Sequence, residues 1–216
     1  IIFVPETIGS IAYLSKNLEE MKKNIVAGFV LTCVGDDLAY SYVPSRQGDT
    51  LADIAAIKIL DSLDVEYKKY SFLDRGSDER QYCSPGVDLP VCSVMRSKYI
   101  EYPEYHTSLD NLDFITSQGL MGGFIVYKKI IKLLESNYRY KATNLCEPQL
   151  GKYNLYPEVG TKESYTNVTD LLNFLAYADG DNDLIKISEL IKKDVLDVVN
   201  LALILERNNL IYVVSK

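Results

Sequence analysis

Short apolar runs alternate with amphipathic stretches from Ile1 to about Ser136. Apolar runs of about four to eight residues bounded by turn residues are typical of buried strands, whereas apolar residues spaced by three and four are typical of helices. A chain that alternates the two buries its strands between helices, which favours parallel pairing. The sequence therefore predicts an α/β fold with a mostly parallel sheet flanked by helices.

Strands are expected at several points of this first part. Residues 1–4 form an apolar run that Pro5 ends, which is typical of a central strand. Residues 24–34 (NIVAGFVLTCV) form the strongest buried-strand pattern, and residues 40–43 alternate like a short edge strand. Further strands are predicted over residues 66–72 and 87–95.

Helices are predicted where apolar residues recur at helical spacing, over residues 10–18, 50–63 and 118–136. Gly9 and Ser10 would cap the first of these helices. The third helix is the longest, and we expect it to cover one face of the sheet.

The pattern weakens over residues 137–164, where Tyr, Asn, Gly and Pro are frequent, so a linker or an irregular arm is predicted there. Beyond it, three helices are followed by a strand, which is the plan of a winged helix-turn-helix module. The predicted helices span residues 168–178, 184–191 and 194–208, with a break at residues 180–182 and a strand over 210–214. The predicted domains are the α/β domain over residues 1–136, the arm over 137–164 and the winged-helix module over 165–216.

The charge of this module argues against nucleic acid as its partner. From Glu163 to Lys216 there are five Lys or Arg and nine Asp or Glu, a net charge of −4. The helix expected to enter DNA opens with Asp194 and carries Asp197, which would face phosphates with the wrong sign. The whole chain has a formal net charge of −7. We therefore expect the module to contact protein, and DNA binding is disfavoured.

Composition places the chain among ordinary soluble globular proteins, with 47% hydrophobic and 25% charged residues and no apolar run long enough to cross a bilayer. Its 17 tyrosines suggest a polar-lined cleft or interface, because a buried phenol needs a partner for its hydroxyl. The four cysteines lack metal-ligand spacing and are interpreted as reduced thiols of a cytoplasmic protein. The chain opens on a strand pattern without an initiator Met or a secretory signal, so we expect a C-terminal piece of something longer.

His106 is the only histidine of the chain and lies in its densest polar and aromatic stretch, residues 102–111. Its imidazole could act as a general base, bind a metal or simply be hydrogen-bonded. Glu6 follows the first predicted strand, at the kind of strand end where α/β sites gather. Its carboxylate could be a general base or could only stabilise a helix N-terminus. Asp78, in the polar loop 74–82, could bind metal, orient a histidine or belong to a solvated loop of local ion pairs.

Four segments together resemble a known family. They are residues 5–10 (PETIGS), 77–79 (SDE), 84–90 (SPGVDLP) and 105–111 (YHTSLDN). In this order they are similar to the zinc aminopeptidase superfamily that includes glutaminyl cyclases. They are more closely similar to bacterial aminopeptidase-like proteins that are often associated with surface-polysaccharide gene clusters. The arm, with its segment 146–151 (CEPQLG), and the winged helix extend the resemblance over nearly the whole chain.

The resemblance implies a zinc-aminopeptidase-like fold and a set of residue roles. Glu6 matches the family's general base, His106 a zinc ligand and Asp78 an acid at the rim of the active site. Thr7 stands where the family has a glutamate ligand, and Thr32 where it has an aspartate ligand. Two further ligands, a His and a bridging Asp, would lie upstream of the first residue.

Three ligands, namely His106 and the two upstream, would still hold one zinc ion with an open water position, the usual catalytic arrangement. The resemblance thus implies that the complete protein is a mononuclear zinc hydrolase of amide or peptide bonds, with a small peptide-like or amino-bearing substrate. Zinc would activate the attacking water, and Glu6 would accept its proton. Asp78 and Tyr105 could bind the substrate amine or the oxyanion. The 216 residues alone are expected to bind zinc weakly and to be inactive.

Two other interpretations stay open. The Thr7 and Thr32 substitutions are also compatible with a catalytically degraded binding protein on the same scaffold, which would hold an amino sugar or a peptide, for instance in surface-polysaccharide metabolism. A winged-helix regulator is the third interpretation, and the acidic charge disfavours it. Oligomerisation is compatible with the sequence, and no membrane partner is expected.

Overall fold

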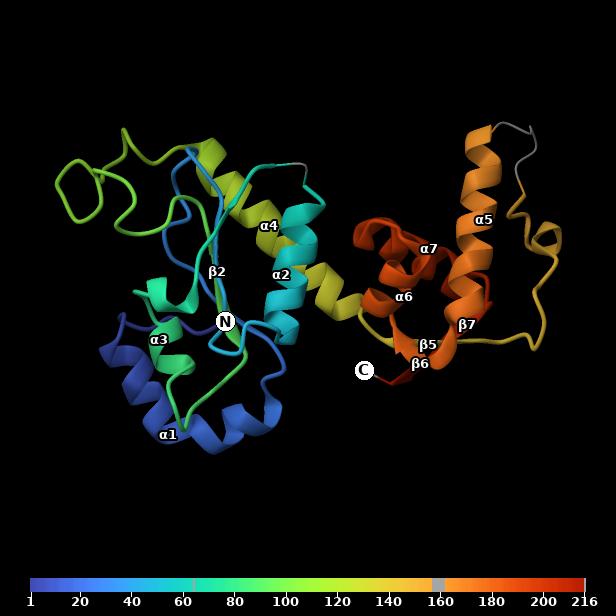
Figure 1. Ribbon diagram of the computed structural model, residues 1–216, viewed down its shortest axis with the longest axis horizontal. Coiled ribbons are helices and arrows are strands. Elements are labelled where there is room, and N and C mark those ends of the chain that lie inside the picture. The colour runs from blue at the N-terminus through green and yellow to red at the C-terminus, as the bar shows by residue number, and fades with distance from the viewer. Residues whose placement is uncertain (64, 157–161, 216) are drawn as a thin grey trace. The chain divides into compact units, whose positions relative to one another are not determined.

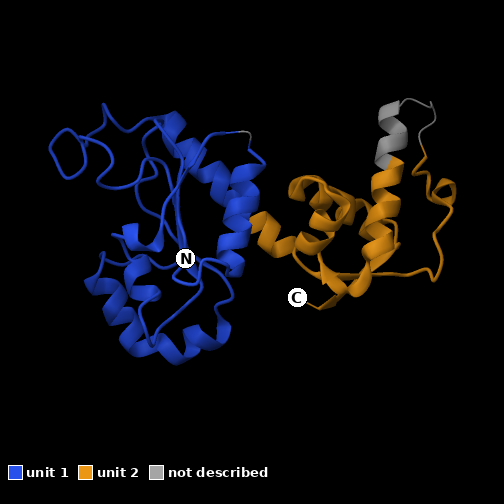
Figure 2. Cartoon of the chain, in the orientation of Figure 1, with its two compact units in different colours: residues 1–130 blue, residues 131–216 orange. Residues whose placement is uncertain are grey.

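The computed structural model describes residues 1–63, 65–156 and 162–215, with the backbone alone over residues 162–167. These residues form two compact units, Ile1–Ile130 and Ile131–Lys216 (Figure 2). The boundary between the units falls inside one long helix, α4 (Ser117–Ser136). Each unit has a sheet of its own, so each can bury apolar side chains independently.

The first unit is built on a mixed four-stranded sheet in the order β1-β4-β2-β3. β1 pairs with β4 and β2 with β3 in parallel, and the central pairing of β2 with β4 is antiparallel. The strands are β1 (Gly28–Val30), β2 (Ser41–Val43), β3 (Lys68–Lys69) and β4 (Val91–Met95). The predicted α/β class is confirmed, but the sheet is mixed.

β2 lies inside this sheet, so the prediction of an edge strand at residues 40–43 is wrong. All three residues of β2 are buried. A strand that alternates polar and apolar residues usually has one face in water. Here a buried carboxylate, instead of water, accepts the hydrogen bond of the polar side chain. The hydroxyl of Tyr42 donates to Oδ1 of Asp53 at 2.7 Å, from the helix α2 (Leu51–Asp61).

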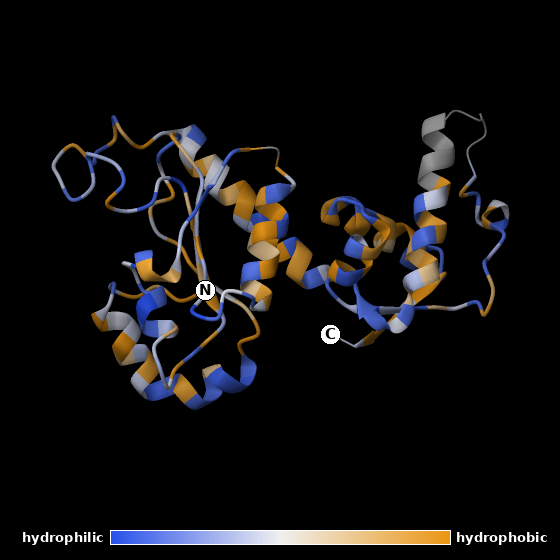
Figure 3. Cartoon of the chain, in the orientation of Figure 1, coloured by the Kyte–Doolittle hydropathy of each residue, from blue (hydrophilic) through white to orange (hydrophobic). Residues whose placement is uncertain are grey.

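α4 covers one face of the sheet, as predicted. The hydroxyl of Tyr127 donates to the carbonyl oxygen of Val30 in β1 at 3.0 Å and also contacts the carbonyl of Val94 in β4. A Cβ on Gly119 would lie 2.2 Å from the carbonyl oxygen of Gly35, so only glycine allows α4 this close to the β1–β2 loop. Figure 3 shows the hydrophobic residues along α2 and α4.

α1 (Ile8–Asn24) is longer than predicted. Its last residue, Asn24, is the first residue of the strand that was expected over 24–34. Its last turns read LEEMKKN, and Glu, Met and Lys are good helix formers. Lys22 and Lys23 lie in the last turn, where a positive charge suits the helix dipole. The short helix α3 (Glu79–Tyr82) contacts α1 (Figure 1).

Residues 1–4 do not form the predicted central strand. They have no regular secondary structure, and the side chains of Ile1 and Phe3 are exposed. An apolar run becomes a strand only when a neighbouring strand satisfies its backbone groups, and none of the described residues pairs with it. The segment leads directly into the turn that carries Glu6.

In its described residues, the second unit contains three α-helices after α4, the 3-10 helix η2 (Leu150–Tyr153) and an antiparallel three-stranded sheet in the order β6-β5-β7 (Figure 1). Its helices are α5 (Lys162–Tyr177), α6 (Leu184–Ile191) and α7 (Val195–Arg207). Its strands are β5 (Arg139–Ala142), β6 (Asp179–Asp183) and β7 (Ile211–Ser215). Phe174, Leu184 and Leu205 are fully buried in its core. The predicted helices and the final strand are confirmed, and the plan is that of a winged helix-turn-helix.

Two stretches of this unit differ from expectation. Residues 137–164, expected as a linker or irregular arm, begin with β5, which is the central strand of the sheet, and residues 157–161 of that stretch lie outside the described residues. Residues 180–182, expected as a break, belong to β6. Gly180 adopts a φ of 99°, and the carboxylate of Asp179 accepts the backbone N–H of Asp181 at 2.8 Å. Turn-forming residues thus belong to a short strand.

Candidate active site

The turn of Glu6 and Thr7 is fastened to the loop that opens α3. The backbone N–H of Thr7 donates to Oδ1 of Asp78 at 2.7 Å, and Nη2 of Arg80 donates to the hydroxyl of Thr7 at 2.7 Å. The same Nη2 lies 3.9 Å from Oε1 of Glu6. The side chain of Glu6 is 55% exposed, whereas Asp78 is buried. Glu6, which is distant in sequence from Asp78 and Arg80, therefore forms one cluster with them at the start of α1.

Glu79 holds the loop of Asp78 and Arg80 in place from inside the unit. Its carboxylate is fully buried, and Oε1 accepts the N–H groups of Gly76 at 2.8 Å and Ser77 at 3.0 Å. The hydroxyl of Tyr99 donates to the same oxygen at 2.7 Å, and the hydroxyl of Ser93 donates to Oε2 at 3.0 Å. A buried carboxylate is tolerated only when it is hydrogen-bonded in this way. The loop is thus fixed by β4, which carries Ser93.

Among the described residues, no hydrogen bond or ion pair joins His106 to Glu6, Asp78 or Arg80, and its ring contacts the neighbouring Tyr105. The two rings are stacked, with centroids 4.0 Å apart and an interplanar angle of 14°. Tyr105 packs against the buried cluster that contains Val43 and Tyr99. Burial raises the pKa of Tyr105, the charges of Cys33 and Glu6 raise it further, and the guanidinium of Arg80 lowers it. Tyr105 is therefore half-buried against this cluster, and His106 beside it is exposed.

Three residues have a positive backbone φ, which residues other than glycine rarely adopt. Thr7 has a φ of 62°, Cys33 of 47° and His106 of 57°. Each such residue costs on the order of 1–3 kcal/mol and persists only where its surroundings enforce it, which is most often at a functional site. Thr7 is enforced by its contacts with Asp78 and Arg80. Asp88, Ile100, Asn154, Lys192 and Asn209 also have a positive φ, so this conformation does not by itself mark the site.

Cys33 lies on the β1–β2 loop beside the same aromatic residues. The hydroxyls of Tyr102 and Thr32 each donate to its Sγ at 3.7 Å, and it packs against the cluster of Val43 and Tyr99. Burial raises the pKa of the Cys33 thiol, and the hydrogen bonds from Tyr102 and Thr32 oppose this only in part. The thiol therefore stays protonated and is a weak nucleophile and metal ligand at neutral pH.

Within the described part of the chain, no group of three or more His, Cys, Asp or Glu side chains comes together in a way that could hold a metal ion. His106 supplies an exposed imidazole, and Glu6 an exposed carboxylate. Asp78 already accepts the N–H of Thr7, and Thr7 has no carboxylate. The residues described therefore do not by themselves make up a zinc site.

Sequence reasoning missed two residues of this cluster, Glu79 and Arg80. Glu79 lies in the segment 77–79 that carries the resemblance, but no role was predicted for it, and both residues were expected to form local ion pairs in a solvated loop. Glu79 instead turns inward, and Arg80 reaches a turn that is 73 positions away. The one available signal was the density of charge in residues 74–80, which exceeds what a simple turn needs.

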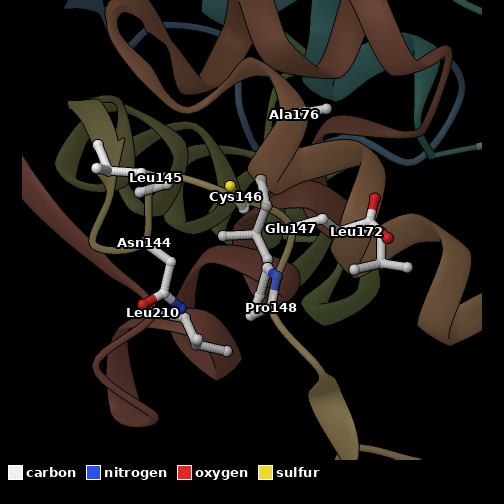
Figure 4. Close-up of a pocket in the computed structure, with 10 residues that line it drawn as sticks. Asn144, Leu145, Cys146, Glu147, Pro148, Leu172, Ala176 and Leu210 are labelled. Atoms are coloured by element: carbon white, nitrogen blue, oxygen red, sulfur yellow. The ribbon is translucent and has the colours of Figure 1, made fainter.

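The structure also contains cavities outside this cluster. One, of about 240 Å³, belongs to the second unit and is lined by residues 144–148, Leu172, Ala176 and Leu210, among others (Figure 4). A more open one, of about 510 Å³, is lined by residues 38–40 and 65–68. Neither includes Glu6, Asp78, Tyr105 or His106.

No helix of the described residues combines the length and the apolar character that crossing a bilayer requires.

Comparison with known proteins separates the chain at nearly the same place as its fold. Residues 1–137 match the family described as "Domain of unknown function (DUF4910)", and residues 138–213 match a "winged helix-turn-helix" family. The chain belongs to the DUF4910 family and carries a winged helix-turn-helix domain.

Two relatives come from Clostridium acetobutylicum. One carries the name "Putative polysaccharide biosynthesis protein with aminopeptidase-like domain" and is 42% identical over 189 residues, which is 87% of this chain and 43% of that protein. The other is a crystal structure of a protein described as a "putative peptidase", with 37% identity and a TM-score of 0.84, covering 97% of this chain and 47% of that one. This chain thus spans less than half the length of either relative. The expected likeness to aminopeptidase-like proteins is confirmed at the level of these names.

Proposed function

We propose that this chain contributes to an aminopeptidase-like hydrolase of amide or peptide bonds, in which Glu6 is the general base. The observation that carries the proposal is the cluster at the start of α1, where an exposed carboxylate is held on a strained turn by Asp78 and Arg80. A general base needs both access to water and a defined position. The Glu6 carboxylate is exposed, and the hydrogen bonds of Thr7 fix the backbone of the turn that carries it. The names of the two relatives support a peptidase-like activity.

In this proposal His106 contributes one nitrogen ligand to a zinc ion whose other ligands lie outside the residues described. When bound, zinc would lower the pKa of its water and polarise the carbonyl of the substrate. Glu6 would accept the proton of the attacking water. Tyr105, whose ring is stacked on His106, would present its hydroxyl to the oxyanion or to the substrate amine. Because Oδ1 of Asp78 holds the Thr7 N–H, we assign Asp78 a positioning role at this end of the site.

A second candidate function is a binding protein on the same scaffold. It is favoured by Thr7, which stands where the resemblance places a glutamate ligand and whose hydroxyl accepts a hydrogen bond from Arg80. Such a protein would hold a small peptide or an amino sugar in the polar region around Tyr105. For either function we propose a cytoplasmic location and a small peptide-like or amino-bearing ligand. Oligomerisation is compatible with both proposals.

The test uses the natural polypeptide that contains these residues, incubated with zinc and then dialysed. Its metal content and its hydrolysis of aminoacyl amides are measured together with three variants. We expect Glu6→Gln to keep zinc and to lose about 10²–10⁴-fold in turnover, the usual share of a general base. We expect His106→Ala to lose zinc, and the exposed α1 variant Glu20→Gln to match the natural protein in both measurements.

Either of two results would defeat the hydrolase proposal: no zinc in the natural polypeptide, or no loss of zinc on His106→Ala. Zinc binding and peptide binding without any hydrolysis would instead favour the binding protein. The isolated 216 residues are expected to show neither turnover nor micromolar zinc affinity, because they supply one histidine.

A further inference from the structure

The guanidinium of Arg80 is anchored at one end only. Nη2 donates to the Thr7 hydroxyl at 2.7 Å and lies 3.9 Å from the Glu6 carboxylate, which is beyond the length of a hydrogen bond. Its backbone N–H donates to the carbonyl of Ser77 at 3.3 Å, in the turn that the buried Glu79 fixes. The head group is therefore oriented by the protein before any ligand arrives.

The rest of this head group is available to a ligand. Arginine carries several N–H donors in a rigid planar fork, and among the described residues its side-chain contacts are those with Thr7 and Glu6. The side chain is 41% exposed.

An oriented guanidinium with free donors recognises planar anions, because two parallel N–H groups match the two oxygens of a carboxylate. The carboxylate of Glu6 is too distant to use these donors, yet it is close enough to repel a second negative charge from its own side. A ligand carboxylate would therefore approach the side of the fork that faces away from Glu6.

We propose that Arg80 binds a carboxylate of the ligand and so selects small aminoacyl compounds with a free carboxylate, such as dipeptides, over the corresponding amides. This selection rests on the proposed function for its identification of the ligand as peptide-like. It adds the substrate class, which neither the sequence motifs nor the relatives specify. Arg80 is then the residue that determines specificity.

Binding of L-alanyl-L-alanine and of L-alanyl-L-alaninamide is measured by titration calorimetry on the natural polypeptide, because the two probes differ only in the carboxylate. We expect the dipeptide to bind at least about tenfold more tightly, which is the effect of one hydrogen bond to a charged group. Arg80→Gln should remove this preference, and Arg80→Lys should keep part of it, since lysine retains the charge but not the fork.

The matched control is Arg75→Gln, which removes an arginine from the same loop. The Arg75 guanidinium lies over the ring of Phe72, 4.8 Å from its centroid, and donates to the carbonyl of the same residue. The dipeptide preference should survive in this variant. Circular dichroism verifies that each variant is folded.

Equal binding of the two probes, no binding of either, or an equal loss of preference in both glutamine variants would overturn the inference. These outcomes are separate from the test of hydrolysis, because the titration requires no turnover. A carboxylate preference that depends on Arg80, in a protein that hydrolyses neither probe, would sustain the subsite and reject the hydrolase.

Discussion

The backbone N–H of Thr7 donates to Oδ1 of Asp78 at 2.7 Å, across 71 positions of the chain. This hydrogen bond joins the turn before α1 to the turn that opens α3. It also explains how Thr7 can hold a φ of 62° without being glycine. The position of Glu6 therefore depends on a residue that the mechanism does not itself use.

Removal of the Asp78 carboxylate is expected to destabilise the first unit. Asp78→Ala leaves the N–H of Thr7 without its acceptor in a part-buried position, which costs about 1–3 kcal/mol. Urea unfolding measures the change in the free energy of unfolding. The control is Asp113→Ala, an exposed aspartate for which a change within about 0.5 kcal/mol is expected. Equal effects of the two substitutions would contradict the positioning role.

Asp53 should dominate the acid sensitivity of the first unit. Burial alone would raise its pKa, but hydrogen bonds from Ser45, Thr50 and Tyr42 outweigh burial and leave the pKa below its ordinary value. A lowered pKa contributes stability that is present above about pH 4, the value for an unfolded chain, and is lost as pH falls through the folded value. Asp53→Asn should therefore cost about 3 kcal/mol at pH 7 and flatten the decline in stability below pH 4.

The control for this substitution is Asp61→Asn. Asp61 is exposed and accepts the hydroxyl of Tyr67 at 2.6 Å. Urea unfolding of both variants at neutral and acidic pH makes the comparison. An equal loss of stability in the two variants at pH 7 would contradict the prediction that the buried hydrogen bonds of Asp53 stabilise the unit more than the exposed one of Asp61.

The tyrosines should ionise in two separate groups. Burial raises the pKa of Tyr42, Tyr99 and Tyr127 far above the ordinary value, and it raises the pKa of Tyr140 to about 12. A raised pKa contributes stability that is complete below about pH 10 and is lost as pH rises toward the folded value. We therefore expect tyrosinate absorbance to rise only partly near pH 10, with the remainder appearing as the chain unfolds. In denaturant all 17 tyrosines should titrate together, and a single native transition near pH 10 would refute this.

Gly119 and Gly122 of α4 should respond differently to alanine. A Cβ on Gly119 would lie 2.2 Å from the carbonyl oxygen of Gly35 and 2.4 Å from that of Asp36, which are backbone atoms that cannot move aside. A Cβ on Gly122 would meet the side-chain ends of Tyr40 and Arg96, at 2.6 Å and 3.1 Å. Gly119→Ala should cost about 1–3 kcal/mol, and Gly122→Ala should cost less, because helix propensity alone favours alanine by about 1 kcal/mol. Thermal or urea unfolding checks the order of the two.

We expect the winged helix-turn-helix not to bind DNA, because its negative charge repels phosphates. α7 begins after Asp194, whose carboxylate accepts the N–H of Leu196 at 2.8 Å, and it carries Asp197 in its first turn. Phosphates would be repelled from this end of the helix. A mobility-shift assay with duplex DNA at low salt should show no shift. A shift that weakens as salt rises would revive the winged-helix regulator.

Much of the helical structure could be predicted because amphipathic spacing reports burial directly. α2, α4, α6 and α7 follow their predicted spans to within a few residues. Strands were less predictable where a polar residue is satisfied inside the protein, as Tyr42 is by Asp53, or where turn residues build a strand, as in β6. The run at residues 1–4 failed for the opposite reason, since its apolar pattern lacks a partner strand among the described residues.

The candidate site could be predicted only in outline. Glu6, Asp78 and His106 could be predicted as candidates because each is a titratable residue that follows a predicted strand or lies in a polar loop. The contact of Arg80 with Thr7 joins residues distant in sequence, and no local pattern encodes it. The left-handed backbone of Thr7, Cys33 and His106 is equally invisible, because these positions lack the glycine that normally signals it.

The buried carboxylate of Glu79 fixes the backbone frame of the α3 loop, and it does so without a hydrogen bond to the exposed side chain of Arg80. Gly76, Ser77, Ser93 and Tyr99 are tied to Glu79, whereas Arg80 is not. A descendant sequence could exchange Arg80 for another side chain while the frame persists. Ligand preference could therefore diversify in this lineage through single substitutions at one exposed position, without the protein having to evolve a new fold around it.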